Sequence, residues 1–347
     1  MMRSISLLVL LLCCNTIQVM AQPGSFRIAQ RSAVFDSTDL FASCHASTLV
    51  SLEKGVLMSA WFGGSAEGKN DVCIWGAFLQ QGKWSRPQLL VTGKQADGKQ
   101  FPCWNPVLFK ARNGVLYLHY KVGPNPREWW ALYIQSADNG RTWSEPIRLP
   151  QGMLGPIRNK PLQLPSGEIL YPSSTESQDG KWEVHMEISD ESLTNWKTYP
   201  VSGDKYGVIQ PTLLQHPEGK LQILCRSREN VITESWSEDG GKTWEAMQPI
   251  ALPNPNSGID AVSLRDGGQL LVYNPLSAGK EWWEGRSVLK VAVSSDGRNW
   301  KEVCTLEDHT SGEYSYPAII QDGEGAVHIT YTHQRKQIQY IRLDPVF

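Results

Sequence analysis

The feature that most constrains this chain is an internal repeat. Six segments share one order of residue types: a polar residue, then usually Pro or Ala, a short apolar run, a turn containing Gly, and a second apolar run. The leading polar residues follow one another at intervals of 50 to 60 residues. They are His45, Asn105, Lys160, Gln210, Asp260 and Tyr316. Each segment is typical of two short strands joined by a hairpin.

A second repeated element follows the hairpins. Residues 136–143 and 237–244 fit the pattern S-x-D-x-G-x-T-W, residues 294–300 are one residue shorter, and residues 189–196 keep only its end points. The Asp can accept hydrogen bonds from backbone amides in a turn, and the Trp can pack between neighbouring sheets. We interpret this element, an Asp-box, as structural rather than catalytic.

Six units of about 50 residues, each with short strands and Gly turns, predict a radial arrangement of four-stranded sheets. We therefore expect an all-β fold, a six-bladed β-propeller of antiparallel blades. A single ring buries both faces of each sheet against its neighbours, so we expect one domain over residues 22–347 with almost no helix.

The N-terminal segment and the overall charge limit where the protein works. Residues 1–21 combine a short basic start, an apolar stretch and small residues before Gln22, which is typical of a cleaved signal peptide. We expect a secreted or periplasmic protein without membrane insertion, because no other stretch is long and apolar enough to span a bilayer. The net charge of −2 indicates no general affinity for nucleic acid.

The six leading positions define a candidate binding site. Innermost strands of a propeller begin around the central axis, so these residues should converge on one mouth, and all six are polar. Several further polar residues should lie near them, and the basic ones suit a carboxylate, which Arg binds with two parallel hydrogen bonds. These are Lys121, Arg158, Glu176, His185, Glu187, Arg226, Arg228, His333 and Arg335. We expect the substrate to be a glycan or an oligosaccharide.

The Asp-boxes and the repeated hairpins resemble the sialidase (neuraminidase) superfamily, in its divergent branch with Asp-box (BNR) repeats. The resemblance extends over nearly all of residues 22–347. It implies removal of terminal sialic acids from glycans by an arginine triad, a Tyr nucleophile assisted by Glu, and an Asp acid/base.

The resemblance transfers two of the three arginines to this chain. Arg226 matches the second arginine and Arg286 the third, while His45 stands where the first is expected. This departure puts sialic acid itself in doubt as the substrate.

The catalytic groups transfer only in part. Tyr314, in the sequence 313–317, matches the nucleophile, and Asp71 or Glu67 matches the acid/base. Gln210 stands at the place of the assisting Glu and cannot take a proton, so Glu313 or His45 would have to replace it.

Three functions remain open at this point. The chain could be an exo-glycosidase acting on a terminal acidic sugar, a lyase acting on uronates through His45 and the tyrosines, or a glycan-binding propeller without activity. No cofactor is implied and no metal-ligand spacing occurs, although a carboxylate-rich mouth leaves Ca²⁺ open. The sequence does not define the oligomeric state.

Overall fold

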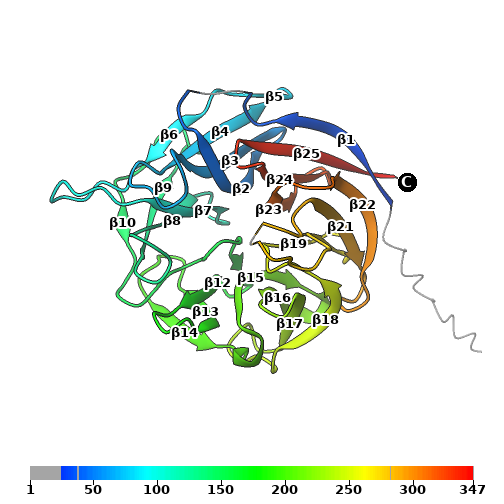
Figure 1. The fold of residues 1–347 in the computed structure, drawn as a ribbon. Coiled ribbons are helices and arrows are strands. Elements are labelled where there is room, and N and C mark those ends of the chain that lie inside the picture. The colour runs from blue at the N-terminus through cyan, green and yellow to red at the C-terminus, as the bar shows by residue number, and fades with distance from the viewer. Residues whose placement is uncertain (1–24, 37–38, 282, 347) are drawn as a thin grey trace, which may run out of the picture.

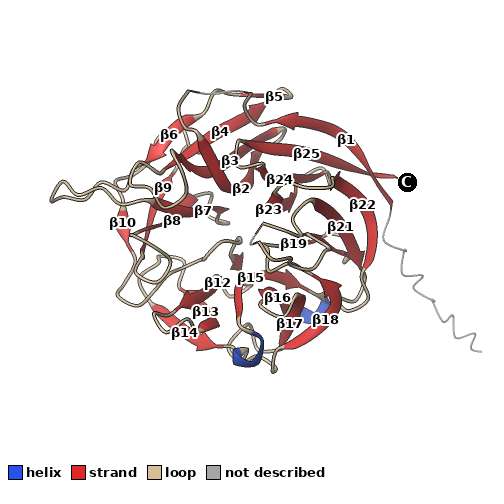
Figure 2. Cartoon of the chain, viewed as in Figure 1, coloured by secondary structure: helices blue, strands red, loops and turns tan. Residues whose placement is uncertain are grey.

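The computed structural model describes residues 25–36, 39–281 and 283–346, and the predicted signal peptide lies outside these residues. Six antiparallel sheets are arranged in a ring around a central axis (Figure 1). The prediction of a six-bladed β-propeller is confirmed. Within the described residues, helix is limited to two short 3₁₀ turns, Asp204–Tyr206 and Pro217–Gly219, and strands dominate (Figure 2).

The first three blades follow in chain order, each beginning at the axis. Blade 1 contains β2 (Ser43–Glu53), β3 (Val56–Gly64), β4 (Cys73–Gln80), β5 (Lys83–Trp84) and β6 (Gln88–Val91). Blade 2 contains β7 (Cys103–Lys110), β8 (Leu116–Val122), β9 (Trp130–Ser136) and β10 (Ile147–Arg148). Blade 3 contains β11 (Leu162–Gln163), β12 (Ile169–Glu176), β13 (Trp182–Ser189) and β14 (Trp196–Pro200).

The remaining blades complete the ring. Blade 4 contains β15 (Val208–Gln215), β16 (Leu221–Ser227), β17 (Val231–Ser237) and β18 (Gln248–Pro253). Blade 5 contains β19 (Asp260–Ser263), β20 (Gln269–Tyr273), β21 (Val288–Ser294) and β22 (Lys301–Asp308). Blade 6 contains β23 (Tyr314–Gln321), β24 (Val327–His333), β25 (Gln337–Val346) and β1 (Ser25–Ala33).

Blade 6 is built from both ends of the described chain. Strand β1 pairs antiparallel with β25, from Ser25 opposite Val346 to Ala33 opposite Gln339, and forms the outer edge of the blade (Figure 1). This pairing fastens the ring with backbone hydrogen bonds and covers an edge that the C-terminal strand would otherwise expose.

The core lies between the blades rather than in one place. Every residue of β8 and of β16 is buried, because each middle strand is covered by a neighbouring blade on both faces. Met58 of blade 1 and Leu118 of blade 2, for example, belong to one apolar cluster and are fully buried.

The Asp-box turns hold the strand ends by one repeated set of hydrogen bonds. Asp138 accepts from the backbone N of Thr142 at 2.9 Å and from its hydroxyl at 2.7 Å, and Asp239 accepts from Thr243 at the same two distances. Asp190 does the same with Thr194 at 2.8 and 2.9 Å, so the segment 189–196 keeps the turn as well as its end points. These aspartates belong to the scaffold.

Candidate functional site

Four of the six inner strands are bulged where they leave the central mouth. The ladder slips between β2 and β3, β7 and β8, β15 and β16, and β23 and β24. At each slip one residue has a positive φ: 54° at Ala46, 39° at Asn105, 56° at Gln210 and 53° at Tyr316. A positive φ is unfavourable for residues with a Cβ and often marks a functional site. The bulge directs these side chains towards the axis.

The residue pairing between β2 and β3 also corrects the alignment of blade 1 with the other repeats. His45 pairs with Phe62 as Trp104 pairs with Lys121, so Ala46 rather than His45 is equivalent to Asn105. The sequence suggested otherwise because Pro follows the mouth residue in the other three bulged strands, whereas Ser47 stands there in blade 1. Five of the six equivalent mouth positions are therefore polar, and the sixth is a small apolar residue.

The inner strands of blades 3 and 5 do not bulge, and a side-chain pair from these blades closes the central channel of the ring below the mouth. Lys160 Nζ donates to both carboxylate oxygens of Asp260 at 3.0 and 2.9 Å, which joins the two blades across the axis. Asp260 also accepts from the hydroxyl of Thr212 at 2.7 Å and from the backbone N of Ile319 at 2.9 Å. With these four hydrogen bonds and 2% exposure, Asp260 is placed as a structural anchor below the mouth.

A central pocket of about 190 Å³ opens at the mouth. It is smaller than the usual pocket for a drug-sized ligand, which suits a group as small as one sugar ring. Of the residues that the sequence placed at or near the mouth, it is lined by Glu67, Asn105, Glu176, Gln210, Arg226 and Tyr316. It is also lined by Trp104, Pro126, Trp129, Trp182 and Ile209.

Arg226 is the cation that faces this pocket. Its Nε donates to the side-chain oxygen of Asn256 at 2.8 Å and its Nη2 to the backbone oxygen of the same residue. Its Nη1 donates to Tyr316 Oη at 2.6 Å and to Gln210 Oε1 at 3.2 Å. All these acceptors are neutral, and within the described part of the chain no carboxylate forms an ion pair with Arg226. Arg226 therefore presents a positive charge to a ligand, in a pocket that also contains the carboxylates of Glu67 and Glu176.

Tyr316 lies at the centre of a basic cluster. The guanidinium carbons of Arg158, Arg226 and Arg286 lie 5.0, 5.7 and 5.9 Å from the centre of its ring. The ring of His45 is 4.2 Å away. Guanidinium groups at such distances are attracted by the face of an aromatic ring. Arg158, Arg286 and His45 do not line the pocket but lie behind Tyr316, where they set its position.

Burial and the neighbouring cations keep His45 neutral. It is 2% exposed, and burial together with the charge of Arg335 lowers the pKa of His45 well below its ordinary value. Arg335 Nη2 donates to His45 Nε2 at 3.4 Å. His45 is thus a buried, neutral ring beneath the pocket, and it does not supply the cation of the missing first arginine.

Arg335 links two predicted carboxylates below the mouth. It donates to Glu67 through Nη1 and to Glu313 through Nε at 2.8 Å, while Arg286 donates to Glu313 at 3.0 Å. Burial alone would raise the pKa of Glu313, but Arg335 and Arg286 outweigh it and hold that pKa below its ordinary value. Glu313 is therefore an anion that positions arginines, and it makes no hydrogen bond to either nearby tyrosine among the described contacts.

Three further predicted site residues, Tyr314, Asp71 and Arg228, also lie outside the pocket. Tyr314 is 5% exposed, its ring stacks on His309 at 4.3 Å, and its hydroxyl accepts from Gln334 at 2.7 Å. Asp71 accepts from the backbone N and the hydroxyl of Ser65 and so braces its own loop. Arg228 stacks on the Trp182 ring at 4.0 Å.

The different placement of Tyr314 and Tyr316 has a simple geometric cause. Residues two apart on a regular strand share a face, but the bulge after Ser315 rotates the chain, so Tyr314 points into the packing between blades and Tyr316 into the pocket.

Glu176 is a pocket carboxylate to which the sequence assigned no role. It ends β12 at the mouth and is partly buried. Burial raises the pKa of Glu176, and the charge of Arg226 and a hydrogen bond from Trp182 oppose the shift. The sequence placed Glu176 near the mouth without a catalytic role and gave no signal for Trp182, because neither belongs to the repeated pattern.

The comparisons with known proteins agree with the fold. A family model for a BNR repeat-like domain matches residues 55–329. This propeller thus has a sialidase-like fold. The chain belongs to the family of proteins with a BNR repeat-like domain. No curated protein sequence matches it.

Solved structures share the fold at low sequence identity. A protein of unknown function from Dyadobacter fermentans is 16% identical, with a TM-score of 0.74 over 93% of this chain and 100% of that one. A Hadza microbial sialidase is 15% identical, with a TM-score of 0.75 over 90% and 68%. An intramolecular trans-sialidase from Ruminococcus gnavus is 14% identical, with a TM-score of 0.70 over 90% and 97%. At these identities the likeness concerns the fold.

Two further observations describe the molecule as a whole. In residues 25–36, 39–281 and 283–346, no helix is long and apolar enough to cross a membrane. The same residues contain no group of three or more His, Cys, Asp or Glu side chains that could hold a metal ion.

Proposed function

We propose that this protein is an exported glycoside hydrolase that binds the acidic sugar at the end of a glycan and releases it. The observation that carries this proposal is Arg226, a buried guanidinium at the pocket whose four hydrogen bonds all go to neutral oxygens. A buried cation without a paired anion is costly, and a ligand carboxylate would remove that cost through charge-assisted hydrogen bonds. Export rests on residues 1–21.

The two pocket carboxylates suit opposite tasks in hydrolysis. Glu176, with its raised pKa, would donate a proton to the oxygen of the leaving group. Glu67, which is ion-paired to Arg335, would accept a proton from the attacking water. The glycosidic bond then breaks, and water supplies the hydroxyl of the released sugar.

Tyr316 would act beside the reacting carbon. Its oxygen lies in the pocket and already accepts a hydrogen bond from Arg226. Gln210 cannot take the phenolic proton, so we assign Tyr316 the task of stabilising positive charge on the sugar through its lone pairs. This assignment replaces Tyr314, which the pocket does not include.

Gln210 favours a second function, binding without turnover. It occupies the place of the assisting Glu in the family pattern. Its amide oxygen and the hydroxyl oxygen of Tyr316 both accept a hydrogen bond from Arg226 Nη1. A propeller with this arrangement would hold an acidic sugar and release it unchanged. A lyase receives no comparable support, because His45 lies behind Tyr316 and outside the pocket.

The experiment that tests the proposal measures binding and release together. Purified protein is screened against glycans ending in sialic, uronic and keto-deoxy acids, and Kd and product formation are followed for each. Arg226→Lys retains the charge but loses the planar fork, so we expect Kd to rise by about 10- to 100-fold, as for the loss of 1–3 kcal/mol.

Arg342→Lys is the matched control, because Arg342 is exposed on β25 of blade 6 and paired with Asp344 at 2.8 Å. Unchanged binding in Arg226→Lys would contradict the proposal. Binding without any product would favour the second function, and an unsaturated product would indicate a lyase.

A further inference from the structure

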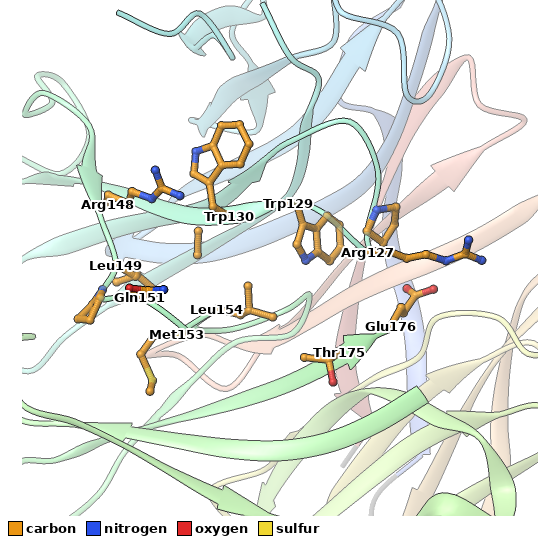
Figure 3. Close-up of a pocket in the computed structure, with 14 residues that line it drawn as sticks. Arg127, Trp129, Trp130, Arg148, Leu149, Gln151, Met153, Leu154, Thr175 and Glu176 are labelled. Atoms are coloured by element: carbon orange, nitrogen blue, oxygen red, sulfur yellow. The ribbon is translucent and has the colours of Figure 1, made fainter. Parts of the chain in front are cut away.

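A second pocket adjoins the central one between blades 2 and 3. It has a volume of about 710 Å³ and shares Pro126, Trp129 and Glu176 with the central pocket. Figure 3 shows Trp129 between Trp130 and Glu176, with Leu154 on the opposite side of the space. The two pockets thus form one continuous surface, in which Trp129 and Glu176 mark the boundary.

The far wall of the second pocket is held in place by a buried carboxylate. Glu187 is 0% exposed and accepts from the backbone N of Leu154 at 2.9 Å and of Gly155 at 2.7 Å. The side chains of Ser173 and His185 contact the same carboxylate at 3.3 and 3.0 Å. A loop fixed by two amides to a buried anion is pre-formed, which lowers the conformational entropy lost when a ligand binds.

The near wall is aromatic and also fixed. Trp129 makes an edge-to-face contact with Trp104, with ring centres 6.1 Å apart. Trp130 packs edge-to-face on Phe101 and is covered by the guanidinium of Arg148 at 5.2 Å, so Trp129 is the ring offered to a ligand. An aromatic face beside polar side chains is the usual way in which proteins bind the apolar face of a sugar.

We propose that the second pocket binds the neutral sugars next to the acidic end sugar, so that the substrate is an oligosaccharide of at least three units. The position of the end sugar rests on the proposed function, whereas the second pocket is inferred from its own walls. Glu176 lies where the two pockets meet, and this is where the bond between the end sugar and the remainder of the chain would lie. The neutral sugar would stack on Trp129, with Leu154 on its other side.

The test compares ligands of different length on three forms of the full chain. Calorimetry measures Kd for the methyl glycoside of a sialic acid, for 3′-sialyllactose and for lactose. Wild-type protein should bind the trisaccharide about 3- to 10-fold more tightly than the methyl glycoside, the gain expected from one aromatic stacking contact.

Two substitutions of one residue provide the filled pocket and its matched control. Leu154→Trp fills the space opposite Trp129 without removing the backbone amide that Glu187 binds. It should abolish both the gain from chain length and the binding of lactose, with Kd for the methyl glycoside unchanged. Leu154→Met is close in volume and should behave as wild type. Melting temperatures establish that both variants fold.

The outcomes separate this inference from the proposed function. If neither the sialic acid ligands nor any acidic glycan of the screen binds, but lactose binds to wild type and Leu154→Met and not to Leu154→Trp, the proposed function is wrong and the second pocket stands. If the gain from chain length is absent in wild type, or persists undiminished in folded Leu154→Trp, the inference is overturned.

Discussion

The inner strands of this propeller begin in two different ways. In blades 1, 2, 4 and 6 the strand bulges at a residue with positive φ, whose side chain is directed towards the mouth. In blades 3 and 5 no such residue occurs at the mouth, and Lys160 and Asp260 pair across the axis instead.

The difference indicates which mouth residues are available to a ligand. Asn105, Gln210 and Tyr316 from the bulged strands line the central pocket, whereas Asp260 is fully occupied by protein donors. All of them are polar residues at equivalent places in the repeat, so residue type alone does not separate the two groups. Backbone conformation does, because the bulge decides whether a side chain enters the pocket or stays below it.

The comparison is tested most strongly at the two tyrosines of β23. Tyr316→Phe removes a hydroxyl that the bulge directs into the pocket, and turnover should fall by roughly 10²- to 10⁴-fold, as for the loss of one catalytic group. Tyr314→Phe removes a hydroxyl bonded to Gln334 and should leave turnover near the wild-type value. Initial rates on the glycan identified by the screen measure both. A normal rate in Tyr316→Phe with a strong loss in Tyr314→Phe would contradict the assignment.

The next largest effect should be on stability, at the pair that closes the channel. Asp260→Ala leaves Lys160 without its partner below the mouth, and the free energy of unfolding should fall by about 3 kcal/mol, at the low end for a broken buried pair because Lys160 is partly exposed. Urea unfolding checks this value. Asp308→Ala, at an exposed strand end, is the control. A folded, equally stable Asp260→Ala with lost binding would instead make Asp260 a ligand residue.

A third prediction concerns the pH dependence of turnover. Glu176 must be protonated to donate, and burial raises its pKa, so turnover should fall as pH rises through that raised pKa. Glu176→Gln should remove this fall of turnover at high pH. It should also lower turnover by about 10²-fold on a substrate with a poor leaving group, and by less on a substrate with an activated leaving group. The measurement is the turnover rate against pH for wild type and Glu176→Gln on both substrates. If the fall of turnover at high pH persists unchanged in Glu176→Gln, another group is the proton donor.

The smallest effect is expected at the Asp-boxes, away from the mouth. Hydrogen bonds from Thr142 and Ser136 lower the pKa of Asp138 to about 2. A lowered pKa in the folded state adds stability above the unfolded value near 4, and this contribution is lost as pH falls towards 2. Asp138→Asn should therefore lower the melting temperature slightly at neutral pH, with a difference from wild type that shrinks below pH 4. Binding of acidic sugars should not change.

The sequence by itself was enough to predict the ring of six blades. Six Gly hairpins at nearly equal spacing and the Asp-box turns are local patterns, and each defines a unit that buries its apolar faces only beside a neighbour. The same patterns placed Asn105, Gln210 and Tyr316 at the mouth, because the start of an inner strand is a position that the repeat defines. Arg226 was placed there by the resemblance to sialidases.

The site itself depended on contacts between residues far apart in the chain. The repeat placed Tyr316 at the mouth and the resemblance placed Tyr314 there, and only the one-residue bulge shows that Tyr316 turns inward while Tyr314 stays in the packing. Glu176 and Trp182 lie outside the repeated pattern, and Arg335 meets Glu67, 268 residues away, only when the ring is closed. Local sequence determined the blades because their hydrogen bonds are local. The tertiary structure decided the pocket because its charges come from different blades and are balanced only across the axis.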